Sequence, residues 1–113
     1  MKRIGFLGCG KIGRALAKHI MELEDTEISF IQDPGFQNDL GLTCPVITAP
    51  DEDLYSHTDL IIECATASVL NANLEQILKN CDLMLFSVTA FSVPAFEAKV
   101  KELYASYGHH VYI

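Results

Sequence analysis

Basic residues are scarce in this sequence, and the signatures of several protein classes are missing. It has 8 lysines and arginines against 15 acidic residues, and the resulting net charge of -7 disfavours DNA or RNA as a partner. No stretch reaches the roughly 18 consecutive apolar residues of a membrane span, and the first residues lack a signal-peptide pattern. We therefore expect a cytoplasmic protein that binds neither nucleic acid nor membrane.

The cysteines also lack any spacing typical of a zinc site or a CxxC redox pair. They lie 35, 20 and 17 positions apart, at Cys9, Cys44, Cys64 and Cys81. Without an export signal they are expected to be reduced thiols. The histidines are scattered along the chain, so the sequence assigns no metal ligand and no catalytic residue.

What the sequence does contain is a regular alternation of short apolar runs and amphipathic segments. Its 113 residues, half of them hydrophobic, suffice for one folded domain and leave no room for a separate substrate domain. Strands are predicted over 3–7, 27–32, 45–48, 59–65, 83–88 and 110–113, with no helix over 37–44. Because helices separate most successive strands, we predict an α/β fold: a Rossmann-type, doubly wound parallel sheet of about six strands with helices on both faces.

The apolar positions also predict which helix faces are buried and where the helices begin and end. The expected buried stripes are Ile12, Ala15, Leu16, Ile20 and Leu23 in the first helix, Val69, Leu70, Leu74, Ile77 and Leu78 in a later one, and Phe96, Val100, Leu103 and Tyr107 in the last. The expected capping residues are Asp51, Thr66 or Ser68, Ser92 and, at the last helix end, Gly108.

A glycine-rich turn between the first strand and first helix carries the clearest functional signal. Gly8-Cys9-Gly10-Lys11-Ile12-Gly13 fits the pattern G-x-G-x-x-G of dinucleotide-binding domains. In this interpretation Gly8 permits the tight turn, Gly10 leaves room for a pyrophosphate, and Gly13 lets the helix pack close to the sheet. The alternative is that these glycines only shape the turn.

An acidic residue follows at the spacing expected of a ribose ligand. Asp33 lies 20 residues after Gly13, at the end of the second predicted strand, where its carboxylate can accept hydrogen bonds from the adenosine ribose. The same charge would repel a 2'-phosphate, and residues 34–44 contain no lysine or arginine, so NAD is favoured over NADP. Lys11 or Arg14 is left to reach such a phosphate, and a solvated turn is the alternative role of Asp33.

The ends of the fourth and fifth strands should border the same cofactor. Ligands of doubly wound sheets lie beyond the carboxyl ends of the strands, which favours Cys64, Ala65, Thr66, Ser87, Thr89 and Ala90 as further cofactor contacts. The hydroxyl groups among them serve equally well as helix caps. Glu63 is expected either to hydrogen-bond structurally or to act as an acid or base, and Cys64 is either a buried thiol or a nucleophile.

Several segments together resemble the N-terminal NAD(P)-binding domain of the L-aspartate dehydrogenase family, which is related to the NAD-binding domain of homoserine dehydrogenase. They are IGFLGCGKIG at the start, ECATA at 63–67, LEQILKN before the fifth strand and SVTAF at 87–91. The resemblance implies that Gly8, Gly10, Ile12 and Gly13 meet the pyrophosphate, Asp33 the ribose, and Ala65 with residues 87–90 the nicotinamide side.

The same resemblance implies an oxidoreductase that converts L-aspartate to iminoaspartate with NAD or NADP. Family members continue into a second domain with the catalytic histidine, so residues 1–113 are expected to form one dinucleotide-binding domain that holds cofactor without turning over substrate. Exposed surface left by a missing domain would favour a homodimer. The alternatives are an NAD(H)-sensing regulatory module that acts through dimerisation or a partner, and a domain that binds a nucleotide sugar or CoA.

Overall fold

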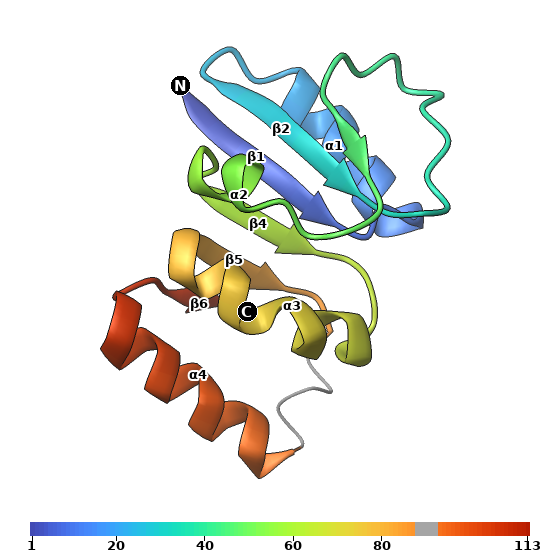
Figure 1. The fold of residues 1–113 in the computed structure, drawn as a ribbon. Coiled ribbons are helices and arrows are strands. Elements are labelled where there is room, and N and C mark those ends of the chain that lie inside the picture. The colour runs from blue at the N-terminus through green and yellow to red at the C-terminus, as the bar shows by residue number, and fades with distance from the viewer. Residues whose placement is uncertain (88–92) are drawn as a thin grey trace.

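The computed structural model describes residues 1–87 and 93–113 and consists of one parallel sheet between two layers of helices. In these residues six strands pair in the order β3-β2-β1-β4-β5-β6 (Figure 1). The strands are β1 (Lys2–Leu7), β2 (Thr26–Gln32), β3 (Val46–Ile47), β4 (Leu60–Glu63), β5 (Asp82–Leu85) and β6 (Val111–Tyr112). The helices are α1 (Lys11–Met21), α2 (Glu52–Ser56), α3 (Ala67–Asn80) and α4 (Pro94–Tyr107).

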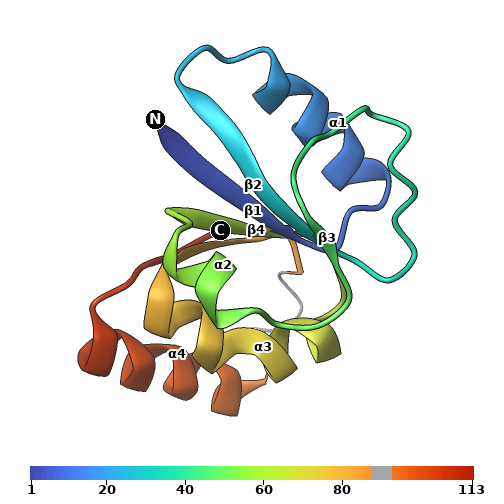
Figure 2. The ribbon, with the colours of Figure 1, turned by 45° about the horizontal axis from the view of Figure 1, so that its top comes forward.

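The two faces of the sheet carry separate cores. Helix α1 covers one face, and α2, α3 and α4 cover the other (Figure 2). The side chains of successive strand residues point to opposite faces of the sheet. Phe30 of β2 therefore packs with α2 and α3, while its neighbour Ile31 packs with α1. This arrangement confirms the predicted doubly wound α/β fold.

The strand order determines where a ligand would bind. β2 lies on one side of β1 and β4 on the other, so the direction of winding reverses at β1. Ligands of such sheets bind beyond the carboxyl ends of the strands at this reversal. β1 ends at Leu7, directly before the glycine turn.

Most predicted strand boundaries agree with the structure to within about one residue, and the caps Asp51, Thr66 and Gly108 are confirmed. The side chain of Asp51 accepts a hydrogen bond from Leu54 N at 3.0 Å to cap α2, and Thr66 accepts one from Val69 N at 3.4 Å to cap α3. Gly108 ends α4 in the left-handed conformation, with φ +76°. No helix occurs over 37–44, as expected, and none of the helices in the described ranges has the length and apolar character needed to cross a membrane.

The predicted buried face of α1 is confirmed only for Ile20 and, in part, for Leu16. Ile12, Ala15 and Leu23 are exposed, whereas Gly13, Ala17 and Ile20 are buried, with Leu16 partly so. The physical reason is the close packing at Gly13, where a Cβ atom would lie 3.3 Å from Cys9 Sγ. Gly13, Ala17 and Ile20 follow one another at helical spacing, so this contact turns their face toward the sheet.

Other details also differ from the predictions. Val69 and Tyr107, expected in buried stripes, are 40% and 41% exposed, because they lie near helix ends where little packs over them. β4 and β5 end at Glu63 and Leu85, earlier than expected. Val93 occupies the N-cap position of α4 without a side-chain cap, and the expected cap Ser92 lies outside the described residues.

Gly5 of β1 provides a test of this packing. A Cβ atom there would lie 2.2 Å from Cε1 of Phe30, whose ring covers the strand and stacks on Tyr55. We expect Gly5→Ala to lower the free energy of unfolding by about 1–3 kcal/mol through overpacking, measured by urea denaturation. Phe30→Leu should lower the free energy of unfolding less in the Gly5→Ala background than in the parent protein, because the two side chains compete for the same space. Equal effects in both backgrounds would contradict this packing.

Candidate functional site

The glycine turn follows β1 and shows which of its glycines the fold itself requires. Gly8 has φ +80°, and a Cβ atom there would lie 2.8 Å from Cα of Ala65, so no larger residue fits. Gly13 allows α1 to pack closely, as described above. At Gly10 a Cβ atom would meet no atom within 4 Å, and φ is an ordinary -81°. The fold therefore needs Gly8 and Gly13, but it leaves open space at Gly10.

The start of α1 has the electrostatic character of an anion site. Gly10 is the N-cap residue and supplies no side-chain hydrogen bond, and the first turn contains no acidic residue. The first backbone N–H groups of a helix lack partners within the helix and carry partial positive charge. Lys11 is exposed at the first helical position and adds a full positive charge. A phosphate group at Gly10 would meet both.

Asp33 lies beside the same turn. Its Oδ2 accepts a hydrogen bond from Cys9 N at 2.8 Å, and its Oδ1 accepts one from Gly35 N at 2.9 Å. Each carboxylate oxygen has further acceptor capacity, which ribose hydroxyl groups can use. The carboxylate that the sequence places 20 residues after Gly13 is thus anchored directly to the middle residue of the turn.

A cleft of about 270 Å³ opens next to Gly10. It is lined by Gly10, Lys11, Ile12, Cys64, Ala65, Phe86 and Ser87. All of these except Phe86 were predicted as cofactor contacts, and the cleft brings them together from the ends of β1, β4 and β5. The exposure of Ile12, which contradicts the predicted helix face, follows from its position in this cleft.

Phe86 lines the cleft but was not predicted, whereas the predicted contacts Gly8, Gly13, Asp33 and Thr66 are not among the lining residues. Phe86 is 43% exposed, and it was overlooked because the run LMLFSV reads as one continuous strand. The Thr66 side chain caps α3 instead. The predicted contacts Thr89 and Ala90 lie outside the described residues.

Glu63 joins the ends of β4 and β5 beneath the cleft. It is completely buried, and the described residues give its carboxylate four hydrogen bonds: from Ala65 N at 2.8 Å, Phe86 N at 3.2 Å, Ser87 N at 2.8 Å and Ser87 Oγ at 2.6 Å. Both oxygens are engaged in a region closed to solvent. Of the two predicted roles, the geometry favours the structural one, in which Glu63 positions Ala65 and Ser87.

The cysteines at this site are thiols and not activated nucleophiles. Burial raises the pKa of both Cys9 and Cys64 to about 11, so neither is ionised near neutral pH. For Cys64, the charge of neighbouring Glu63 raises the pKa further. Cys64 is therefore suited to lining the cleft, as a small side chain, and not to nucleophilic attack.

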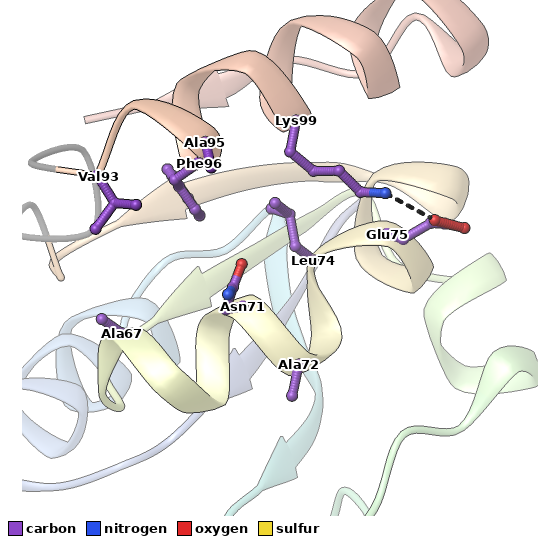
Figure 3. Close-up of a pocket in the computed structure, with 9 residues that line it drawn as sticks. All are labelled: Ala67, Asn71, Ala72, Leu74, Glu75, Val93, Ala95, Phe96 and Lys99. Atoms are coloured by element: carbon purple, nitrogen blue, oxygen red, sulfur yellow. Dashed lines mark hydrogen bonds and ion pairs between the residues drawn. The ribbon is translucent and has the colours of Figure 1, made fainter.

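A larger cavity, of about 430 Å³, lies between α3 and α4 (Figure 3). Asn71 and Leu74 extend into it from α3, and Lys99 reaches across from α4 to Glu75, with Nζ 3.4 Å from Oε1. None of the predicted cofactor contacts within residues 1–87 and 93–113 lines it. Because the helix start at Gly10 lines the smaller cleft and the Asp33 carboxylate is hydrogen-bonded to the adjacent Cys9, we assign the candidate site there.

The role of Glu63 can be tested by an isosteric change. In Glu63→Gln an amide group would face N–H donors, leaving buried groups unpaired, and we expect the free energy of unfolding to fall by about 1–3 kcal/mol in urea denaturation. Glu75→Gln is the matched control, because its side chain is 58% exposed and its pair with Lys99 should contribute less than about 1 kcal/mol. Equal stability of the parent and Glu63→Gln proteins would contradict the structural role.

Comparison with known proteins relates this site to one family. Residues 8–113 match the family model described as homoserine dehydrogenase, NAD binding domain. L-aspartate dehydrogenase of Methanocaldococcus jannaschii is 24% identical over 100% of the chain, and that of Archaeoglobus fulgidus is 31% identical over 97%. The structure of aspartate dehydrogenase from Thermotoga maritima matches 99% of the chain with a TM-score of 0.71 at 22% identity, a likeness of fold.

The chain spans less than half the length of these proteins: 45% of the first, 44% of the second and 44% of the third. The match confirms the resemblance inferred from the motifs and the expected cofactor class, NAD with NADP as the alternative. It extends from Gly8 in the glycine turn to Ile113, so it includes every residue lining the cleft. The chain belongs to the family of homoserine dehydrogenase NAD-binding domains.

Proposed function

We propose that residues 1–113 form the NAD(P)-binding domain of an amino-acid dehydrogenase similar to L-aspartate dehydrogenase. The observation that carries this proposal is the open space at Gly10, a glycine that the packing of the fold does not require. A glycine there is explained by a ligand that approaches the backbone. The names of the relatives support the dehydrogenase assignment, since the two sequences described above are L-aspartate dehydrogenases.

In this proposal each part of the site binds one part of the dinucleotide. The N–H groups at the start of α1, with Gly10 and Lys11, bind the diphosphate, and Asp33 accepts hydrogen bonds from the adenosine ribose. Ile12, Cys64 and Ala65 form the wall of the cleft. Ser87 donates its hydroxyl hydrogen to Glu63 and keeps lone pairs free to accept a hydrogen bond from the nicotinamide amide. Thr89 and Ala90 remain predicted contacts on that side.

The reaction itself needs residues beyond this chain. When bound, the cofactor supplies the ring that accepts or gives a hydride. The chain holds and orients that ring, while the substrate-binding and catalytic residues belong to the remainder of the enzyme, consistent with relatives more than twice as long. We further infer a cytoplasmic location, which the free cysteines favour. The alternative of an NAD(H)-sensing module finds no support among the relatives, which are dehydrogenases.

Titration of the protein with NADH by calorimetry tests the proposal. We expect binding in the micromolar range by the parent protein, and a loss of at least about tenfold in Gly10→Val, because the side chain fills the space needed by the diphosphate. Ala15→Val is the control, since it places the same valine side chain on the exposed face of α1. Both variants should stay folded, with unfolding temperatures only slightly below that of the parent, because valine is a weaker helix former than alanine. No heat with NADH or NADPH would refute the function, and full affinity in Gly10→Val would place the ligand elsewhere.

A second titration tests the ribose ligand. Asp33→Ser should weaken NADH binding and narrow the difference between NADH and NADPH, because it removes the charge that opposes a 2'-phosphate. Asp33→Asn is the companion variant, since its amide oxygen can still accept the hydrogen bond from Cys9 N. Parent protein that binds NADPH as tightly as NADH would contradict the assigned role of Asp33.

A further inference from the structure

Arg14 is held in place by the loop that follows β2. Its Nη1 forms a short hydrogen-bonded ion pair with Oδ1 of Asp39, and its Nη2 donates to the carbonyl oxygen of Gln37 at 3.0 Å. The guanidinium carbon also lies 4.8 Å from the centre of the Phe36 ring, within the range of a cation–π contact. The orientation of the guanidinium is therefore fixed from several sides.

This arginine lies at the adenosine side of the candidate site. Arg14 is one helical turn after Gly10, to whose carbonyl oxygen its N–H donates at 2.9 Å. The loop that holds it begins at Asp33, and Phe36 N donates to the Asp33 carbonyl oxygen at 3.2 Å. Arg14, Asp33 and Asp39 all influence the pKa of the Cys9 thiol, so their charges gather around the glycine turn.

The Arg14 guanidinium is already paired, which limits what it can offer to a phosphate. Asp33 and Asp39 each contribute one negative charge here, Arg14 contributes one positive charge, and Lys18 is near enough to lower the pKa of Asp39 as well. The Arg14 hydrogen bond holds the pKa of Asp39 below its ordinary value, so Asp39 stays ionised at neutral pH. Residues 34–44 contain no further lysine or arginine to receive an additional anion.

We propose that Asp39 makes the site selective for a dinucleotide with a free 2'-hydroxyl, by holding Arg14 and neutralising the guanidinium that a 2'-phosphate would otherwise bind. The inference deepens the proposed function and rests on it. Arg14 is then a latent phosphate ligand, and Asp39 acts through it as a positioning residue. Asp39 is 68% exposed, so its side chain can be changed without disturbing a core.

Calorimetric titration with NADH and NADPH at low salt tests this mechanism in four proteins: the parent, Asp39→Asn, Arg14→Met/Asp39→Asn and Glu102→Gln. In Asp39→Asn we expect the ratio of NADPH affinity to NADH affinity to rise about tenfold, the effect of one charge-assisted contact. The gain should disappear in the double variant, which lacks the guanidinium. It should also shrink as salt is added, because salt screens exposed charges. Glu102→Gln removes the same charge from exposed α4, on the opposite face of the sheet, and should leave the ratio unchanged (Figure 2).

The outcomes separate this inference from the function on which it rests. An unchanged ratio in Asp39→Asn, with NADH still bound by the parent, overturns the role of Asp39 and leaves the proposed function intact. The rise in the ratio of NADPH affinity to NADH affinity could persist in the double variant or be reproduced by Glu102→Gln. Either result shows that the change in net charge, and not Arg14, is responsible. If the parent binds neither dinucleotide, the proposed function fails and this inference fails with it.

Discussion

The close approach of the Gly8 backbone to Ala65 is the contact on which the candidate site depends. A Cβ atom on Gly8 would lie 2.8 Å from Cα of Ala65, so the chain can turn here only without a side chain. The turn brings the start of α1 to the carboxyl end of β4, where Cys64 N donates to the Leu7 carbonyl oxygen at 2.8 Å. With α1 packed down at Gly13, the intervening Gly10 is left facing the cleft. The close approach of Gly8 to Ala65 thus positions the turn, the start of α1 and the cleft beside Gly10.

Two carboxylates then hold this frame together. Glu63 is buried and takes hydrogen bonds from Ala65 and Ser87, which ties two strand ends together. Asp33 holds the turn through Cys9 N but lies at the rim, where oxygen lone pairs remain available. The difference lies in their access to solvent and not in their chemistry. The same functional group is therefore structural at Glu63 and suited to binding at Asp33.

Local sequence patterns predicted the features that depend on neighbouring residues. The alternation of elements, the glycine turn and the caps at Asp51 and Thr66 all follow from patterns a few residues long, and the position of Asp33 follows from the length of one helix and one strand. These patterns also carried the family resemblance. They predicted every residue that lines the cleft except Phe86.

Features that arise from tertiary contacts could not be read from the sequence. The buried face of α1 is set by the contact of Gly13 with Cys9, which an amphipathic pattern does not contain. The pair of Arg14 and Asp39 joins a helix to an irregular loop 25 positions away.

The most direct test of the central claim is an amide NMR titration of the protein with NADH. We predict shifts concentrated at the backbone amides of Gly10, Lys11 and Ala65. Shifts confined to the cavity around Asn71 and Lys99 would contradict it.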